Sequence, residues 1–479
     1  MVIRTKIVAT VGPASGDVEM LRQLVQAGCD VFRVNFSHGS DEQREGFLRN
    51  VRQVEEEMGE PLAVMADLCG PKIRVGMIHG GSVLLSEAQT LRISREPVEG
   101  DAQRVSTTLP ELVDEAHPGE RILLNDGKLV LQVEQATEDH LTCRVLRGGV
   151  LASGKGVNLP QTELRLSALT EKDRRDAQWI AERGFDFVAL SFVRRGEDVR
   201  TLRRLLREAG SEAHIVSKIE KPQAVENIDE ILDATDAVMI ARGDLGVEME
   251  LPKVPAVQKR IARQCQRRGK PCIIATQMLE TMTDVPVPTR AEVSDVANAV
   301  LDRADAVMLS GETAVGKYPA RAVAMMNEIV DEMQAYHDEI VDRVHVEYAS
   351  APTTASLTGA IDHIMQTEEI RAVAAFSVSG TTARMLAKNR LPCMVLALSP
   401  DIAAVRRMCM YYGVQGRRVT QMPEHTRDVL AMVGDLAEEL HVAHEGEKIV
   451  VLSGRPIDQP GTTNTLVVHQ IGQAESQEH

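Results

Sequence analysis

The chain has 479 residues and a formal net charge of −16, and 43% of its residues are hydrophobic and 26% charged. This length exceeds the ~250–300 residues at which a single core stops growing, so we expect several domains. The acidic balance disfavours a nucleic-acid binder, whose surface must attract phosphates. No apolar run approaches the ~18–20 residues of a membrane-spanning helix, so we expect no membrane partner.

The N-terminal residues and the cysteines allow a prediction of the cellular compartment. Residues 1–12 lead directly into a strand-like pattern, so no signal peptide is predicted. The seven cysteines are scattered, odd in number and include no Cys-x-x-Cys pair. Because disulfides are rare in reducing compartments, this usage predicts a reduced, cytoplasmic protein.

Eight short apolar runs dominate the first two thirds of the chain. A near-continuous apolar run is typical of a parallel strand covered on both faces, and segments with helical spacing lie between the runs. Eight strand-helix units in series predict an α/β fold of the TIM (β/α)8 barrel type. The runs are Lys6–Gly12, Val31–Gly39, Leu62–Gly70, Phe185–Val193, His214–Glu220, Ala237–Gly246, Pro271–Met278 and Ala306–Ala314.

Two further domains are predicted. Residues 71–163 interrupt the third unit with short alternating strands, and Asn125-Asp126-Gly127 indicates a β-hairpin. We expect an inserted all-β barrel domain there, placed as a lid over the active-site face of a barrel formed by residues 1–70 and 164–345. A new strand-helix rhythm predicts an open α/β domain over residues 351–479.

Polar residues gather at the predicted carboxyl ends of the barrel strands, where TIM barrels carry their active sites. Lys218 and Glu220 in "IVSKIE" would point the same way, because alternate strand residues share a face. An isolated Lys-x-Glu would indicate a structural ion pair, but other strand ends supply further candidates. These are Arg33, Asn35, Ser37, His38, Asp67, Lys72, Arg74, Gly243, Asp244 and Thr276.

These residue types suit one class of chemistry. Glu220 and Asp244 are hard oxygen ligands with which Mg²⁺ or Mn²⁺ could also bind substrate oxygens. Lys218 and Arg33 could neutralise a phosphate or carboxylate, and Thr276 could hydrogen-bond a substrate or hold a water. The set predicts phosphoryl transfer, which relies on positioning and charge neutralisation.

The third domain carries "SVSGTT" (Ser377–Thr382) between a strand and a helix. Hydroxyls and backbone N–H groups at a helix N-terminus can form an anion site. The same spacing is equally typical of an ordinary serine or threonine N-cap, so both interpretations stay open.

The chain resembles the pyruvate kinases nearly end to end. The motifs that carry the resemblance are "KIVATVGPAS", "RVNFSHG", "DLCGPKIR", "GKGVNLP", "SKIEK", "ARGDLGVE", "ATQMLETM" and "MLSGETAVGKYP". The resemblance implies transfer of phosphate from phosphoenolpyruvate to ADP, giving pyruvate and ATP as the last step of glycolysis. It also implies a mobile β-barrel lid, a C-terminal effector domain and a homotetramer.

The resemblance also implies residue roles. Lys218 would neutralise the transferring phosphoryl group, Glu220 and Asp244 would hold the divalent ion, and Thr276 stands where the family places its proton-relay group. Phosphoenolpyruvate would contact Arg33, Lys218, Gly243, Asp244 and Thr276. The nucleotide would contact Arg33, Asn35, His38, Arg74 and the lid residue Lys155. The effector, a phosphorylated sugar or nucleotide monophosphate, would contact Ser377, Ser379, Gly380, Thr381, Thr382 and Arg455.

Two departures concern the monovalent cation, for which Asn35, Ser37 and Asp67 match the ligands of the family. Leu68 stands where a threonine is common, and Lys72 stands where many members have glutamate. A lysine can supply a fixed positive charge in place of the ion, so we expect activity without K⁺.

Two other interpretations remain at this stage. A different barrel enzyme acting on pyruvate or phosphoenolpyruvate, such as a lyase, would not explain the lid with Lys155 or the effector-like domain. A catalytically dead metabolite sensor conflicts with the presence of Arg33, Lys218, Glu220 and the other site residues. ADP dependence tests the first alternative, and detectable turnover would exclude the second.

Overall fold

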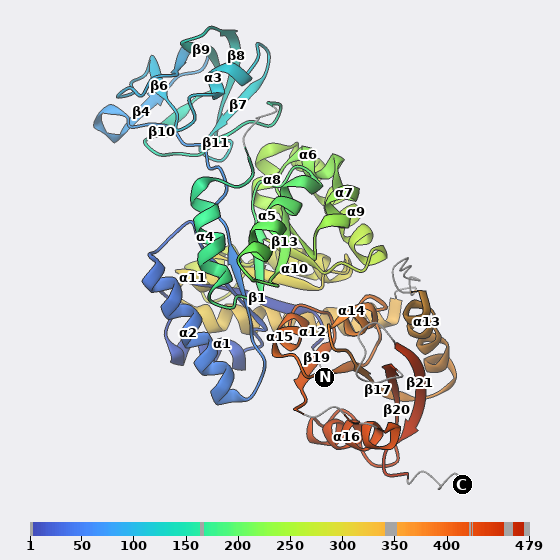
Figure 1. Cartoon of the computed structure of the whole chain (residues 1–479). Helices are drawn as coiled ribbons and strands as arrows, with labels where there is room; N and C mark the ends of the chain where they lie inside the picture. The colour runs from blue at the N-terminus through green and yellow to red at the C-terminus, as the bar shows by residue number, and fades with distance from the viewer. Residues whose placement is uncertain are drawn as a thin grey trace.

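The computed structural model describes residues 3–162, 167–340, 352–420, 423, 425–454 and 463–473. Three bodies follow one another along the long axis of the molecule (Figure 1). A β-rich domain lies at one end, a helix-wrapped barrel in the middle, and an α/β domain at the other end. Among the described residues, no helix combines the length and apolar character needed to cross a membrane.

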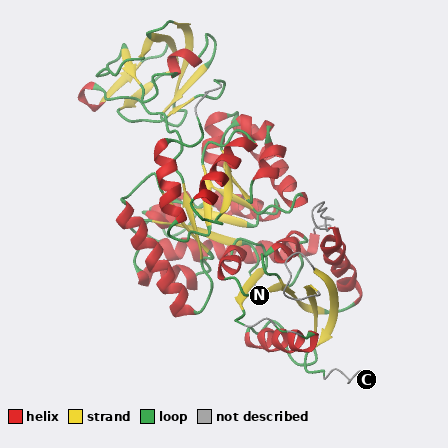
Figure 2. Cartoon of the chain, viewed as in Figure 1, coloured by secondary structure: helices red, strands yellow, loops and turns green. Residues whose placement is uncertain are grey.

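The central body is a closed barrel of eight parallel strands surrounded by helices (Figure 2), which confirms the predicted TIM barrel. Every strand coincides with one of the eight apolar runs. The strands are β1 (Lys6–Val11), β2 (Val31–Asn35), β3 (Ala63–Asp67), β12 (Phe187–Leu190), β13 (His214–Ile219), β14 (Ala237–Ala241), β15 (Cys272–Ala275) and β16 (Ala306–Leu309).

The helices of this body follow the strands in the sequence. The first are α1 (Val18–Gln26), α2 (Asp41–Met58), α4 (Glu171–Ala181), α5 (Gly196–Glu208), α6 (Pro222–Glu226) and α7 (Ile228–Ala234). The others are α8 (Arg242–Glu248), α9 (Val254–Arg267), α10 (Arg290–Leu301), α11 (Gly311–Ala314) and α12 (Pro319–Ile340). Two short 3-10 helices, η2 (Leu251–Lys253) and η3 (Glu280–Thr283), lie between them.

Alternation along β13 divides its side chains between two cores. Ile215 and Ile219 belong to the core between strands and helices, whereas Val216 belongs to the core of the barrel interior. Because a strand repeats every two residues, Lys218 and Glu220 follow Val216 on the interior face. The two-residue alternation that buries Val216 inside the barrel therefore also brings the charged side chains together, at the carboxyl end of the strand.

The inserted domain has a hydrophobic core of its own, which includes the fully buried Leu131 and Cys143. Its six-stranded sheet has the order β11-β7-β8-β9-β5-β6, and β10 pairs with β4. Asn125, Asp126 and Gly127 all have positive φ at the turn between β7 and β8, which confirms the predicted hairpin.

The inserted domain is all-β apart from short helical turns, as predicted. Its strands are β4 (Ser82–Leu85), β5 (Thr90–Ser94), β6 (Arg104–Ser106), β7 (Arg121–Leu124), β8 (Leu129–Ala136), β9 (His140–Arg147), β10 (Gly149–Ala152) and β11 (Val157–Asn158). The helical turns are η1 (His79–Gly81) and α3 (Leu112–Glu115).

The C-terminal domain is an open five-stranded sheet with the order β19-β18-β17-β20-β21, in which only β21 is antiparallel. This topology confirms the predicted open α/β fold. The strands are β17 (Ile370–Phe376), β18 (Met394–Ser399), β19 (Val414–Arg418), β20 (Lys448–Gly454) and β21 (Thr463–Gln470). The helices are α13 (Pro352–Thr367), α14 (Thr381–Lys388), α15 (Ile402–Met408) and α16 (Thr426–Glu439).

A buried ion pair joins the C-terminal domain to the barrel. Asp305 immediately precedes β16, so it lies at the amino end of the barrel strands, and Lys388 ends α14. Both residues are buried, and the Lys388 ammonium donates to Asp305 Oδ2. The same oxygen accepts the backbone N–H of Cys272 at 2.8 Å. The C-terminal domain therefore covers the end of the barrel opposite the inserted domain (Figure 1).

We predict that Lys388→Met destabilises the protein, because it leaves the Asp305 carboxylate buried without its main cationic partner. Removing one member of a buried pair costs about 3–5 kcal/mol. Urea unfolding followed by circular dichroism should show a lower midpoint. Lys448→Met is the matched control, since it removes a half-exposed pair with Glu368 and should cost less than ~1 kcal/mol. Equal shifts for both variants would contradict this account.

Candidate active site

An arginine and an aspartate from adjacent strands form a buried pair inside the barrel. Val31 and Met65 belong to the interior core, so Arg33 and Asp67, two residues further along β2 and β3, continue on the same face. Arg33 Nε and Nη2 donate to Asp67 Oδ2 at 2.7 and 2.5 Å. Arg33 Nη1 donates to Thr10 Oγ1 at 2.9 Å. The guanidinium is therefore held in one orientation.

Lys218 lies among three acceptors. Its Nζ is 2.9 Å from Glu220 Oε1 and 3.3 Å from Asp67 Oδ1, and it donates to Ser191 Oγ at 2.8 Å. Burial alone would lower the pKa of Lys218, but the charges of Asp67 and Glu220 outweigh it and raise that pKa. Burial likewise opposes ionisation of Asp67, yet Lys218 and Arg33 lower its pKa. Lys218 and Asp67 therefore stabilise each other's charged forms.

Two carboxylates stand where the sequence predicts a divalent cation. Glu220 is 3% exposed, and its Oε2 accepts the backbone N–H of Phe192 at 2.9 Å. Asp244 lies in the first turn of α8, where partial desolvation and the charge of Glu220 raise its pKa to about 6. Repulsion between neighbouring carboxylates is relieved by a cation, and their oxygens suit Mg²⁺ or Mn²⁺. The residues therefore fit such an ion.

Thr276 lies on a strained turn after β15. Its φ is 71° and that of Gln277 is 54°, which is a costly conformation for residues other than glycine. Thr276 Oγ1 donates to the Ala275 carbonyl at 2.6 Å and accepts the Gly243 N–H at 2.7 Å. Arg242 Nη2 donates to the Thr276 carbonyl at 2.8 Å. These bonds hold the hydroxyl beside the start of α8.

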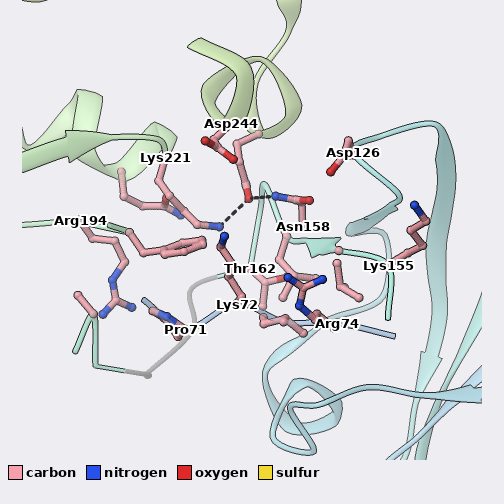
Figure 3. Close-up of a pocket in the computed structure, with 18 of the residues that line it drawn as sticks. Pro71, Lys72, Arg74, Asp126, Lys155, Asn158, Thr162, Arg194, Lys221 and Asp244 are labelled. Atoms are coloured by element: carbon pink, nitrogen blue, oxygen red, sulfur yellow. Dashed lines mark hydrogen bonds and ion pairs between the residues drawn. The ribbon is translucent and has the colours of Figure 1, made fainter. Parts of the chain in front are cut away.

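A cavity of about 630 Å³ opens between the barrel and the inserted domain (Figure 3). Asp244 lines this cavity, so the cavity lies beside the charged cluster. Lys72, Arg74 and Lys155 line it from the side of the inserted domain and bring three positive charges to its wall. A volume of this size is typical of a site for a small-molecule ligand.

The predicted monovalent-cation residues lie near one another, with Lys72 among them. Lys72 Nζ donates to Ser37 Oγ at 3.2 Å, and the Ser37 backbone N–H donates to Asn35 Oδ1 at 3.0 Å. His38 is exposed, and partial desolvation together with the charges of Lys72 and Arg74 lowers its pKa. A cation therefore already occupies the neighbourhood of Ser37.

Sequence reasoning missed four polar residues around the site. Ser191 directly follows β12, so its position at a strand end was the signal that could have found it. Lys221 follows Glu220 and forms a 2.7 Å ion pair with the buried Glu248, whose same oxygen accepts from Asn158 Nδ2 at 2.9 Å. No sequence pattern pairs Asn158 with Glu248, because the first belongs to the inserted domain and the second to the barrel.

The predicted effector loop joins β17 to α14. Gly380, with φ of 81°, is the N-cap of α14, and the Ser377 hydroxyl accepts the backbone N–H of Thr382, the second residue of the helix, at 3.2 Å. A serine hydroxyl therefore caps this helix from outside the N-cap position. Thr382 Oγ1 lies 2.7 Å from Thr463 Oγ1 in a buried contact, whereas Ser379 and Thr381 are exposed hydroxyls 3.0 Å apart. Arg455 lies outside the described residues.

The fold and the site define a TIM-barrel enzyme with a buried charge cluster beneath a cavity. The family of the pyruvate kinase barrel domain matches residues 2–323, and that of the pyruvate kinase alpha/beta domain matches residues 356–469. A pyruvate kinase from Methylorubrum extorquens is 42% identical over 97% of this chain and 96% of its own length. A pyruvate kinase from Agrobacterium vitis is 41% identical over 99% of this chain and 98% of its own length.

A solved structure agrees with these relatives. A pyruvate kinase from Cryptosporidium parvum matches with a TM-score of 0.90 and 31% identity, covering 98% of this chain and 96% of that one. This chain belongs to the pyruvate kinase family. It is a phosphotransferase, as the sequence predicted, and the family membership disfavours the alternative of a lyase.

Proposed function

We propose that this protein transfers the phosphoryl group of phosphoenolpyruvate to ADP, giving pyruvate and ATP. The observation that carries the proposal is the Lys218 ammonium, held by Asp67, Glu220 and Ser191. The charge of Asp244, which lines the cavity, also acts on this ammonium. Phosphoryl transfer needs fixed positive charge near the moving group and little covalent help from the protein. Lys218 meets this need, because its partners fix both its charge and its position.

The other predicted site residues are assigned roles according to their positions around Lys218 and the cavity. Arg33, fixed by Asp67, adds a second positive charge, and Gly243 lets the backbone approach the substrate closely. Glu220 and Asp244 would hold Mg²⁺ or Mn²⁺, which when bound supplies positive charge to substrate oxygens. On the opposite wall, Arg74 and Lys155 bind the phosphates of the nucleotide, with Asn35 and His38 nearby.

Thr276 completes the reaction. Departure of the phosphoryl group leaves an enolate, whose carbon must gain a proton to give pyruvate. The Thr276 hydroxyl is oriented by Gly243 and Ala275, so it can hold a water or pass a proton toward that carbon. The strained backbone of Thr276 supports this role, because strain is retained where it positions a reacting group.

Glu220→Gln tests the proposed metal site. The change removes one negative charge and nearly preserves the shape, so we expect kcat to fall by about two orders of magnitude or more. The measurement is ATP formation from phosphoenolpyruvate and ADP at several Mg²⁺ concentrations. Glu250→Gln, on the exposed residue after α8, is the matched control and should keep normal turnover. Near-normal turnover of Glu220→Gln would refute the site.

We propose that Lys72 replaces the monovalent cation. Pyruvate kinases generally use Mg²⁺ and K⁺, and Asn35, Ser37 and Asp67 would be the K⁺ ligands here. The Lys72 ammonium contacts Ser37 at 3.2 Å, so it can supply the positive charge that K⁺ brings in other members. Asp67 is already neutralised by Arg33 and Lys218.

Buffers free of K⁺ and NH₄⁺ test this replacement. We expect full activity without either ion, and Lys72→Glu should create a requirement for K⁺, because it exchanges the fixed cation for an anion that needs one. The measurement is the steady-state rate as a function of K⁺. Lys128→Glu, at an exposed lid position, makes the same charge change and should create no requirement. Strong activation of the unmodified protein by K⁺ would disprove the replacement.

We also propose that the protein is a cytoplasmic homotetramer activated by a phosphorylated sugar or nucleotide monophosphate. The ligand would bind at Ser377, Ser379, Gly380, Thr381 and Thr382, with Arg455 adding a cation. Support comes from the exposed hydroxyls of Ser379 and Thr381, which lie 3.0 Å apart at the N-terminus of α14, an end of the helix that favours an anion. Activation requires tighter binding of the effector to the active state, usually by ~1–3 kcal/mol.

Thr381→Glu tests the effector site. Thr381 is exposed, whereas Thr382 is buried against Thr463, so a carboxylate at residue 381 repels a phosphate without disturbing packing. We expect loss of activation by the best sugar phosphate or nucleotide monophosphate, with basal turnover retained. Ser356→Glu, at an exposed position of the same domain, is the matched control. An unchanged response of Thr381→Glu would place the effector elsewhere.

A further inference from the structure

One carboxylate, that of Glu248, connects the inserted domain to the barrel. Glu248 is the last residue of α8 and is 3% exposed. Its Oε1 accepts from Lys221 Nζ at 2.7 Å and from Asn158 Nδ2 at 2.9 Å, and Figure 3 shows the two bonds converging on one oxygen. Asn158 ends β11 of the inserted domain, whereas Lys221 follows β13 of the barrel.

Glu248 is linked to both proposed metal ligands, to Asp244 through α8 and to Glu220 through Lys221. Asp244 and Glu248 are four residues apart in α8, so they share one face of the helix, one turn apart. Lys221, the second partner of Glu248, is bonded directly to Glu220 in the chain. A displacement of Glu248 would therefore have a short path to Asp244 along the helix and to Glu220 along the backbone.

The hairpin turn of the inserted domain also lies close to this turn of α8. A Cβ built on Gly127, in the hairpin turn of the inserted domain, would lie 3.7 Å from Val247 Cγ1. The other oxygen of Glu248 is buried and makes no hydrogen bond with the described residues. A buried charged oxygen without a partner is costly, so the carboxylate depends on its bonds to Asn158 and Lys221.

We propose that Glu248 is a positioning residue that couples the inserted domain to the divalent-cation site. The bond from Asn158 fixes the end of α8 and the Lys221 loop, and these two segments hold Asp244 and Glu220 in place. The inference rests on the proposed metal-binding roles of Glu220 and Asp244. Its consequence is specific: a change in the inserted domain, on a residue that does not bind the metal, alters the affinity for the metal.

Mn²⁺ binding without substrates tests this coupling, because the free ion is counted directly by electron paramagnetic resonance. We expect Asn158→Ala to weaken Mn²⁺ binding about tenfold, the lower end of the usual effect of residues that orient metal ligands. At saturating Mn²⁺, kcat should change much less. Gln135→Ala, on an exposed lid residue of β8, is the control and should bind Mn²⁺ normally. Normal Mn²⁺ binding by Asn158→Ala would overturn the proposal.

Reversing the hydrogen bond between Asn158 and Glu248 distinguishes a specific coupling through this bond from a general loss of structure. Asn158→Asp sets two carboxylates against each other and should weaken Mn²⁺ binding further. Adding Glu248→Gln restores a hydrogen bond with reversed polarity, so the double variant should bind Mn²⁺ more tightly than Asn158→Asp alone. Absence of this rescue would overturn the proposal.

The variant Glu220→Gln distinguishes the two hypotheses. If it binds Mn²⁺ as well as the unmodified protein, the metal site itself is wrong. If it loses Mn²⁺ while Asn158→Ala and Asn158→Asp bind it normally, the site stands and only the coupling fails.

Discussion

The pairing of the Lys218 ammonium with the Asp67 and Glu220 carboxylates is the interaction on which the rest of the site depends. A buried charge without a partner costs several kcal/mol, so these groups are stable only together. With Arg33, the cluster contains two cations and two anions. Its charges therefore balance one another, and the hydrogen bonds hold Lys218 and Arg33 in fixed positions.

Barrel closure brings this cluster together. Around the barrel the strands run in the order β14-β13-β12-β3-β2, which places in sequence Asp244, Lys218, Ser191, Asp67 and Arg33. Ser191 follows β12, the strand between those that carry Lys218 and Asp67. Its hydroxyl lies 2.8 Å from Lys218 Nζ and 3.5 Å from Asp67 Oδ1, so it links the two residues. A continuous polar network thus crosses four neighbouring strands at the end where TIM barrels carry their chemistry.

The features that could be predicted from the sequence are those that depend on a local pattern of residues. Strand periodicity placed Lys218 and Glu220 on one face, and the apolar runs located all eight barrel strands, because a strand buried on both faces leaves a clear signature. Contacts across domains have no such signature. The pairing of Lys388 with Asp305 joins residues 83 positions apart, and that of Asn158 with Glu248 joins residues 90 positions apart. Both pairs form only when folded domains pack against each other.

The most direct test of the central claim is a steady-state comparison of Lys218→Met with the unmodified protein, using phosphoenolpyruvate, ADP and saturating Mg²⁺. The methionine retains much of the apolar stem but removes the ammonium. If Lys218 acts mainly on the charge that develops during transfer, kcat falls by orders of magnitude while KM for phosphoenolpyruvate changes little. A variant that keeps its kcat and loses only affinity would contradict the account.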